Sequence, residues 1–201
     1  MAKKKQVGRR VEGWKAKSLY KVYAPDNLNK AYIGDTISSD AENVVGRVIQ
    51  TTLGEIMQDY GKQHVRIKLR IANVTGDAAY TEFMGHELTR DYIRSMVKRR
   101  SSRIDCQIPY TTRDGRKVRL TVTCFTISRA NLSQTHEIRR MISDTVLRQV
   151  TAGDVPTLVN TVVSGDLSRD LFKLVKPVYP VRRVEIIKSK VEPIAVAPAT
   201  V

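Results

Sequence analysis

Residues that could perform catalysis are few in this sequence and stand far apart. His86-Glu87 begins like the His-Glu-x-x-His pattern of zinc proteases, but Arg90 occupies the position of the second histidine. His64 and His136 stand in other stretches, with no cysteine or pair of carboxylates beside them. The sequence contains no glycine-rich phosphate loop and no Gly-x-Ser-x-Gly turn. We therefore predict a protein without enzymatic activity, bound metal or cofactor, whose histidines are structural or exposed.

The two cysteines, Cys106 and Cys124, fall in two stretches that alternate like paired strands. In the pairing that we favour they face each other, so a disulfide is geometrically conceivable. Two cysteines supply only half of a tetrahedral zinc shell. In a reducing compartment they act most simply as small buried hydrophobic side chains, and this is the prediction.

Positive charge is the main chemical signal. The chain has 201 residues, a formal net charge of +15 and a pI near 10.0, and 41% of its residues are apolar. That apolar fraction can build a core, so the charge belongs to a folded protein. Like charges on one compact body repel, and a polyanion relieves this repulsion. Nucleic acid is the first candidate partner, ahead of an anionic membrane surface.

Neither a membrane span nor a secretion signal is recognisable. No apolar stretch approaches the length that crosses a bilayer, and the basic residues after Met1 precede no apolar segment. The sequence therefore predicts a cytoplasmic protein that is not associated with a membrane.

Three groups of cations are the candidate nucleic-acid-binding residues. The first is an arm over residues 1–17, which holds one acid and too few apolar residues for a core, so we predict a flexible arm. The second group follows a short helix, and the third surrounds a hairpin tip. The candidates are Lys3, Lys4, Lys5, Arg9, Arg10, Lys15 and Lys17 in the arm, Lys98, Arg99, Arg100 and Arg103 after the helix, and Arg113, Arg116 and Lys117 at the tip.

A short helix must position the second group. Thr89 can cap its first turn, and the basic residues at its end suit the helix dipole. The spacing of Ile93, Met96 and Val97 predicts that these three side chains form its buried stripe.

A hairpin must position the third group. Apolar and polar residues alternate on both sides of Asp114-Gly115, which predicts two half-buried strands. An odd-numbered loop with Gly115 in the left-handed conformation places Tyr110 opposite Leu120, and likewise Ile108 opposite Val122. This loop would project the tip cations together, as a phosphate-binding surface requires.

The remaining segments predict an α+β fold. We expect an extended segment over 18–25, turns over 25–27 and 33–35, a hairpin with strands 65–71 and 79–84 around a turn at 73–77, helices over 133–150, 154–165 and 170–175, and a closing strand over 178–188. Ser133 is the predicted cap of the first of these helices, and Asp154 with Pro156 begins the second. Arg66, Lys68 and Arg70 form a row on the first hairpin, and a solvated face and a binding face fit them equally.

Residues 44–57 fit two structures. Apolar residues recur at helical spacing, and Ser39 with Glu42 could form a capping box. Gly46, Gly54 and a β-branched run favour a strand instead.

The chain is short enough for one folded domain, with no internal repeat and no long linker. We predict a basic flexible arm over 1–17, a single α+β domain over 18–190 that is rich in strands to about residue 128, and a disordered tail over 191–201.

Several motifs, in order, resemble the S3Ae (eS1) family of archaeal and eukaryotic small-subunit ribosomal proteins. The resemblance runs from Trp14 to Pro193, and the length of the chain suits the archaeal type. Its motifs are Trp14-x-x-Lys17-x-x-Tyr20 through Pro25, Gly46-Arg47-Val48 with Leu53-Gly54-Glu55, Thr89 through Val97, Asp114-Gly115, and Tyr179 through Val191. Gln50, Thr52 and Ile56 depart from the family pattern.

The resemblance implies an antiparallel β-barrel-like sheet flanked by helices, in which Arg47–Leu53 is a strand. It also implies a structural constituent of the small ribosomal subunit, on its platform near the messenger exit, that binds rRNA and neighbouring ribosomal proteins, with mRNA nearby. A free cytoplasmic RNA-binding regulator shares the same charge and is the alternative. A small RNA-processing enzyme would need a clustered acid or histidine site.

Overall fold

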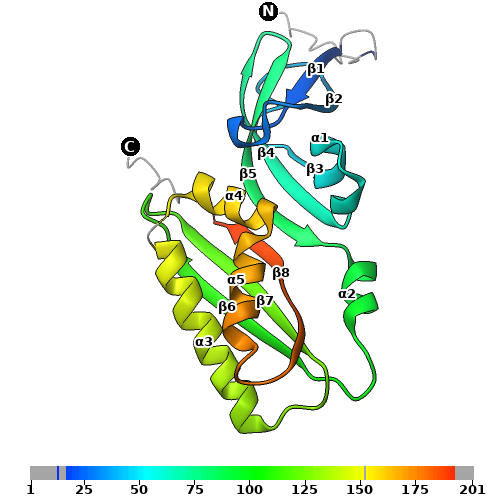
Figure 1. Ribbon diagram of the computed structural model, residues 1–201. Coiled ribbons are helices and arrows are strands. Elements are labelled where there is room, and N and C mark those ends of the chain that lie inside the picture. The colour runs from blue at the N-terminus through cyan, green and yellow to red at the C-terminus, as the bar shows by residue number, and fades with distance from the viewer. Residues whose placement is uncertain (1–12, 14–16, 152, 193–201) are drawn as a thin grey trace, which may run out of the picture.

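The computed structural model describes residues 13, 17–151 and 153–192, which form a mixed eight-stranded sheet with helices (Figure 1). The strands are β1 (Ser18–Tyr23), β2 (Tyr32–Ser38), β3 (Val48–Thr52), β4 (Val65–Thr75), β5 (Ala78–Leu88), β6 (Arg103–Thr111), β7 (Lys117–Thr126) and β8 (Val181–Val191). The helices are α1 (Leu53–Met57), α2 (Arg90–Met96), α3 (Leu132–Thr151), α4 (Val155–Ser164) and α5 (Asp166–Val175), with 3-10 turns η2 (Asp26–Leu28) and η3 (Tyr60–Lys62). The arm residues Lys3, Lys4, Lys5, Arg9, Arg10 and Lys15, and the predicted tail from residue 193, lie outside the described residues.

The sheet branches at β5. One edge of β5 pairs with β4 along nearly its whole length. On the other edge of β5, residues 78–80 pair with β1 in parallel and residues 85–87 pair with β8. The longest path is therefore β2-β1-β5-β8-β7-β6, and β3 attaches to β4.

This topology confirms the α+β class and corrects the expected antiparallel barrel-like sheet. The sheet is mixed, because β1 and β5 run parallel while the other pairs are antiparallel. It is also open. β1 pairs with the beginning of β5 and β8 pairs with its end. The two end strands, β2 and β6, do not pair with each other.

The main core lies between the helices and the strands β6, β7 and β8. Helices α3 and α5 pack on one face of these strands (Figure 1). Ile138, Ile142 and Val146 are fully buried along α3, since a spacing of four keeps them on one helix face. β6 alternates exposed and buried residues from end to end, so its apolar side chains all face the helices.

Several element boundaries differ from the sequence predictions. The predicted turn at residues 33–35 is wrong, because this segment lies inside β2 and pairs with β1. Helix α3 begins one residue before its predicted cap, Ser133. Gly165, with φ +78°, ends α4 as predicted but also begins α5 at Asp166. The closing strand occupies residues 181–191, so Val191 is a buried sheet residue and not part of a tail.

Residues 44–57 form neither a continuous helix nor only a strand. The β-branched run Val48–Thr52 is β3, as the family resemblance implied, and pairs with β4. Thr52 then caps the short helix α1: its hydroxyl accepts from the Glu55 N–H, and the Glu55 carboxylate accepts from the Thr52 N–H. The capping box is therefore present, but thirteen residues after the predicted Ser39.

The β6–β7 hairpin has the predicted odd loop in a register shifted by two residues. Gly115 has φ +73°, as expected. Ile108 lies opposite Leu120 and Tyr110 opposite Val118. The loop is centred one residue earlier than predicted, because the Thr112 N–H donates to the Arg116 carbonyl. A shift of two residues keeps every side chain on its face, so the predicted buried set is correct although the partners are not.

Both cysteines are buried and unpaired, which confirms that they act as small hydrophobic side chains. In the observed register Cys106 lies opposite Val122, and Cys124 lies opposite Ile104. Burial raises the pKa of Cys106 to about 11 and that of Cys124 to about 12. Thiols with such pKa values remain protonated near neutral pH and are poor nucleophiles.

The contact between β5 and β8 joins the two halves of the sheet. At Gly85 the backbones approach so closely that a Cβ atom would overlap the Ser189 carbonyl oxygen. The neighbouring His86 ring is buried, with its Nε2–H donating to the Ile186 carbonyl at 3.0 Å. The Ser189 hydroxyl lies 2.5 Å from its Nδ1 and also accepts from the His86 N–H. A neutral imidazole makes both ring contacts, with Nε2–H donating to Ile186 and Nδ1 accepting from the Ser189 hydroxyl, and it places no charge in the core.

We predict that Gly85→Ala lowers the free energy of unfolding by about 2 kcal/mol or more, because two paired backbones must separate. Gly34→Ala is the matched control: Gly34 is also in a strand, and an added Cβ there meets nothing within 4 Å. We expect this control to change stability by less than about 1 kcal/mol. Urea denaturation followed by circular dichroism measures both, and equal effects would contradict the proposed close contact.

We also predict a pH-dependent stability that originates at His86. Burial lowers the pKa of His86 to about 4, whereas an unfolded histidine titrates near 6.5. Between these values the unfolded state binds more protons, so this contribution is complete above pH 6.5 and is lost as the pH falls towards 4, by up to about 1.4 kcal/mol per pH unit. The neutral variant His86→Gln should lose stability less steeply between pH 6.5 and 4.5 in urea titrations. Identical slopes for both proteins would refute the assignment.

Candidate nucleic-acid interface

The cations after α2 are held in a tight turn. The Ser101 N–H and hydroxyl both donate to the Lys98 carbonyl, at 3.4 and 2.6 Å. Arg99 and Arg100 occupy the centre of this turn, and Arg100 has φ +62°. Lys98, Arg99 and Arg100 are all exposed. The turn therefore presents three adjacent positive charges to solvent, beyond the end of the helix on which the sequence placed them.

Helix α2, which precedes this turn, is less buried than expected. Met96 is buried and Ile93 is partly buried, but Val97 lies beyond the helix and is 50% exposed. Thr89 occupies the cap position without a capping hydrogen bond from its side chain. The buried stripe of α2 therefore lacks Val97 and is one residue shorter than predicted.

The hairpin tip is anchored to two other elements. The Asp114 carboxylate accepts from the Val155 N–H at the start of α4, at 3.2 Å. Arg116 forms a long ion pair of 4.0 Å with Glu82 of β5. Arg113 and Lys117 are exposed. Two of the three predicted tip cations thus remain exposed, while Arg116 turns towards the sheet.

The second and third groups do not form one patch. They lie at opposite ends of the β6–β7 hairpin, and the nine residues of β6 separate them by roughly 30 Å (Figure 1). Arg103, at the first end, is also partly neutralised by an ion pair of 3.0 Å with Asp105. Lys17, the only arm cation that the structure describes, is exposed just before β1.

A basic sheet face connects the two groups. We define the open face as the outward side of β6, β7, β8, β5 and β4, opposite the buried residues that contact the helices. Between β7 and β8, Arg119 lies opposite Lys190 and Thr121 lies opposite Lys188. Between β8 and β5, Lys188 lies opposite Glu87. The exposed cations of the open face are Arg66, Arg70, Arg119, Lys188 and Lys190, with Lys68 half-buried among them.

Acids neutralise part of the open face. Glu87 forms ion pairs with Lys68 at 3.0 Å and with Lys188 at 3.9 Å. The hydrogen bond from Lys68, with the nearby cations, holds the pKa of Glu87 below its ordinary value. Arg119 pairs with Glu192 at 3.4 Å. Arg66, Arg70 and Lys190 have no acidic partner within the described residues, so they carry the surplus charge that an anion would contact.

Sequence analysis found only part of this face. Arg66, Lys68 and Arg70 stood out as a row, but nothing in the row itself distinguishes solvation from binding. Lys188 was predicted to end the closing strand and Lys190 to follow it, and neither was selected. Their alternation with buried Ser189 and Val191 is the signal that could have found them. Joining the two rows required the pairing of β5 with β8, which sequence patterns do not specify.

The histidines provide no catalytic centre. Both ring nitrogens of the buried His86 have hydrogen-bond partners, which confirms the prediction that this histidine is structural. His64 stacks on Tyr92 with ring centroids 4.0 Å apart, and His136 is exposed on α3. In the part of the chain that the structure describes, no three His, Cys, Asp or Glu side chains gather as a metal site would require, and no helix has the length and apolar character of a membrane span.

Comparison with known proteins identifies a family. The model of the Ribosomal S3Ae family matches residues 4–194. The small ribosomal subunit protein eS1 of Methanoregula boonei is 64% identical over 200 residues, which are 100% of both chains. That of Methanoculleus marisnigri is 58% identical over 195 residues, covering 97% of this chain and 99% of the other. That of Desulfurococcus amylolyticus is 38% identical over 177 residues, covering 88% and 83%.

These matches confirm the resemblance seen in the sequence, including its archaeal type. Proteins of this family are structural components of ribosomes and not enzymes, so the prediction of a non-enzymatic chain is also confirmed. The chain belongs to the Ribosomal S3Ae family.

Proposed function

We propose that this protein is a structural constituent of the small ribosomal subunit in the cytoplasm, where it binds rRNA and neighbouring ribosomal proteins and supports translation. The observation that carries the proposal is family membership over nearly the whole chain, together with a net charge of +15 on a folded α+β body. The family resemblance adds a finer position, on the platform near the messenger exit, with mRNA nearby.

The RNA-binding surface that we propose has three parts. The exposed turn Lys98–Arg100 and Arg103 lie at one end of β6–β7, Arg113, Arg116 and Lys117 lie at the other, and the open face connects them. Their backbones are held in a sheet and a closed turn, so little backbone freedom remains to be lost on binding. The arm residues Lys3 to Lys17 would add contacts by ordering along the RNA.

Such a surface reads RNA by its backbone. Arginine and lysine contact phosphates, and each contact releases counterions, so affinity should fall by about 0.7–0.9 log units per log unit of salt for each contact. Folded RNA is recognised mainly by shape and by backbone and 2′-hydroxyl contacts. Few base-specific contacts are therefore expected.

The exposed turn provides a direct prediction. Reversing both charges with Arg99→Glu and Arg100→Glu should weaken binding to purified small-subunit rRNA and reduce the salt slope by about 1.4–1.8, while the thermal unfolding midpoint stays unchanged. Filter binding at several salt concentrations measures this. The control is Arg140→Glu with Arg148→Glu, the same charge change on the exposed side of α3. An equal loss in both double variants would show only an effect of net charge.

The open face provides a second, independent prediction. Arg66 and Lys190 belong to different strands and lack acidic partners among the described residues. The double variant Arg66→Glu with Lys190→Glu should lower rRNA affinity about as much as the turn variant, because it also removes two phosphate contacts. The same α3 control applies. Wild-type affinity in this variant would remove the open face from the interface and leave the two ends of the hairpin.

Sedimentation of a native lysate tests the whole proposal. The protein is followed by mass spectrometry through sucrose gradients at low and high salt. Migration with the small subunit that survives moderate salt is the expected result. Recovery only at the top of both gradients would overturn the ribosomal assignment and favour a free RNA-binding regulator.

A further inference from the structure

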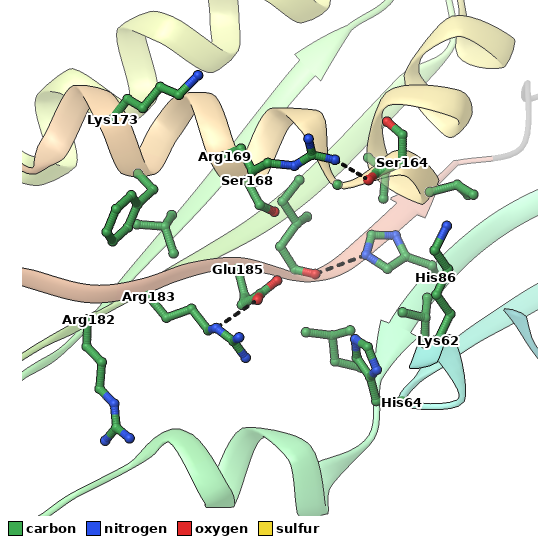
Figure 2. A pocket seen from close by; sticks show the side chains of 18 residues that line it. Lys62, His64, His86, Ser164, Ser168, Arg169, Lys173, Arg182, Arg183 and Glu185 are labelled. Carbon is green, nitrogen blue, oxygen red and sulfur yellow. Dashed lines mark hydrogen bonds and ion pairs between the residues drawn. The ribbon is translucent and has the colours of Figure 1, made fainter. Parts of the chain in front are cut away.

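A cleft of about 600 Å³ lies between β8, the α4–α5 corner and the end of β5 (Figure 2). The cleft is separate from the cations assigned to RNA above. Its floor is mainly aliphatic, and its apolar lining includes Val65, Leu88, Val163, Phe172, Val184 and Ile186. Figure 2 shows charged side chains around the cleft, among them Lys62, Arg169 and Arg183.

The cleft lies along an edge of β8. Residues of both strand faces line it: Val184 and Ile186 face the helices, whereas Arg183 and Glu185 belong to the opposite face. A cavity over one face of a strand would be lined by alternate residues only. Figure 2 shows the same geometry, with β8 running between the α5 side chains and those of His64 and Lys62.

This edge of β8 has no strand partner among the described residues. β5 pairs with residues 188–190 of β8, and its ladder goes no further towards Val181. The Ile186 carbonyl points to this side, because it accepts from the His86 ring. β7 pairs with the opposite edge of β8 from Val181 to Ile186, so the remaining backbone groups of this segment lie on the side of the cleft. An unpaired strand edge of this kind accepts an additional strand.

The rim of the cleft is basic. Lys62, Arg169, Lys173, Arg182 and Arg183 line it, and Glu185 is its one acidic lining residue. Three of these cations already form ion pairs. Arg169 lies 3.1 Å from Asp166, and Lys173 lies 4.0 Å from Asp170. Arg183 lies 3.8 Å from Glu185. Lys62 and Arg182 have no ion pair within the described part of the chain. The rim therefore attracts negative charge, while the floor accepts apolar side chains.

We propose that this cleft binds an extended segment of a neighbouring protein, in which apolar residues alternate with Asp or Glu. The segment adds a short strand to β8, inserts its apolar side chains over Val163, Phe172 and Val184, and directs its carboxylates to Lys62 and Arg182. This inference deepens the protein-neighbour part of the proposed function and rests on it for the existence of such a partner. It does not depend on the RNA-contacting cations.

The chemistry of the floor favours protein over RNA. Bases bind single-strand sites by stacking on flat aromatic or guanidinium surfaces. Here most of the floor is aliphatic, and the nearby His64 and Tyr92 rings stack on each other. An unpaired β8 edge offers alternating backbone donors and acceptors, which a peptide backbone matches.

The test uses the full-length protein and a fluorescein-labelled pool of decapeptides in which Val, Ile or Leu alternates with Asp or Glu. Fluorescence anisotropy should detect binding. The same pool with Lys in place of the acids should not bind, and neither should a pool N-methylated at alternate peptide nitrogens. Ser168→Trp fills the cleft from α5 and should weaken binding at least tenfold, whereas Ser133→Trp on the exposed start of α3 is the matched control with unchanged affinity.

Two kinds of result would contradict the proposal. No binding by the acidic pool at 1 mM peptide, or binding that Ser168→Trp leaves unchanged, overturns the docking site. An RNA oligonucleotide that displaces the peptides and fails to bind Ser168→Trp would assign the cleft to nucleic acid instead. Filter binding of rRNA to Ser168→Trp should match wild type, so failure of the docking site and failure of the RNA-binding function are read separately.

Discussion

The close backbone contact between β5 and β8 holds the whole sheet together. Among the described strands, only β5 belongs to both halves, because its first residues pair with β1 and its last residues with β8. Only three residue pairs make the second connection, and they require a residue without a side chain at position 85. The buried His86–Ser189 contact lies in the same three pairs and adds hydrogen bonds where the ladder is shortest. Every surface that spans both halves, including the open face, depends on this joint.

The alternation of strand side chains explains how a protein with net charge +15 keeps a well-packed core. In β4, Ile67, Leu69 and Ile71 are fully buried while the residues between them are Arg or Lys. β8 repeats this pattern with Ser189 and Val191 inward and lysines outward. The same periodicity that builds the core thus sorts charge onto one face. Because Glu87 is shared by Lys68 and Lys188, and Arg66, Arg70 and Lys190 have no acidic partner among the described residues, part of the charge remains free for an anion.

Local patterns predicted most of the strands, the three C-terminal helices and the left-handed Gly115, since each depends on neighbouring residues, but they missed β2 and the first turn of α5. What failed was pairing. The β6–β7 register shifted by two residues because the loop closes on Thr112 and Arg116, and the polar Asp114 anchors to a helix forty residues later. The parallel β1–β5 pair and the joint at Gly85 link residues far apart in sequence, and no periodicity encodes them. For the candidate site, the sequence placed Lys98, Arg99 and Arg100 together at the end of a helix, but their position in a turn beyond α2 and their distance from the hairpin tip needed the fold.

The position of β8 in the sheet has a consequence for the order of folding. β8 is the last strand of the described chain, yet it lies between β5 and β7 and not at an edge. Until residues 181–191 leave the ribosome that synthesises them, the long edge of β7 and the short edge at residues 85–87 of β5 lack their partner, and the main core is incomplete. Contacts of such high sequence separation form slowly, because a long loop must close first. The pairing of β8 with β5 and β7 therefore forms only after residues 181–191 have been synthesised, and until then the β7 edge is open to pairing with other strands.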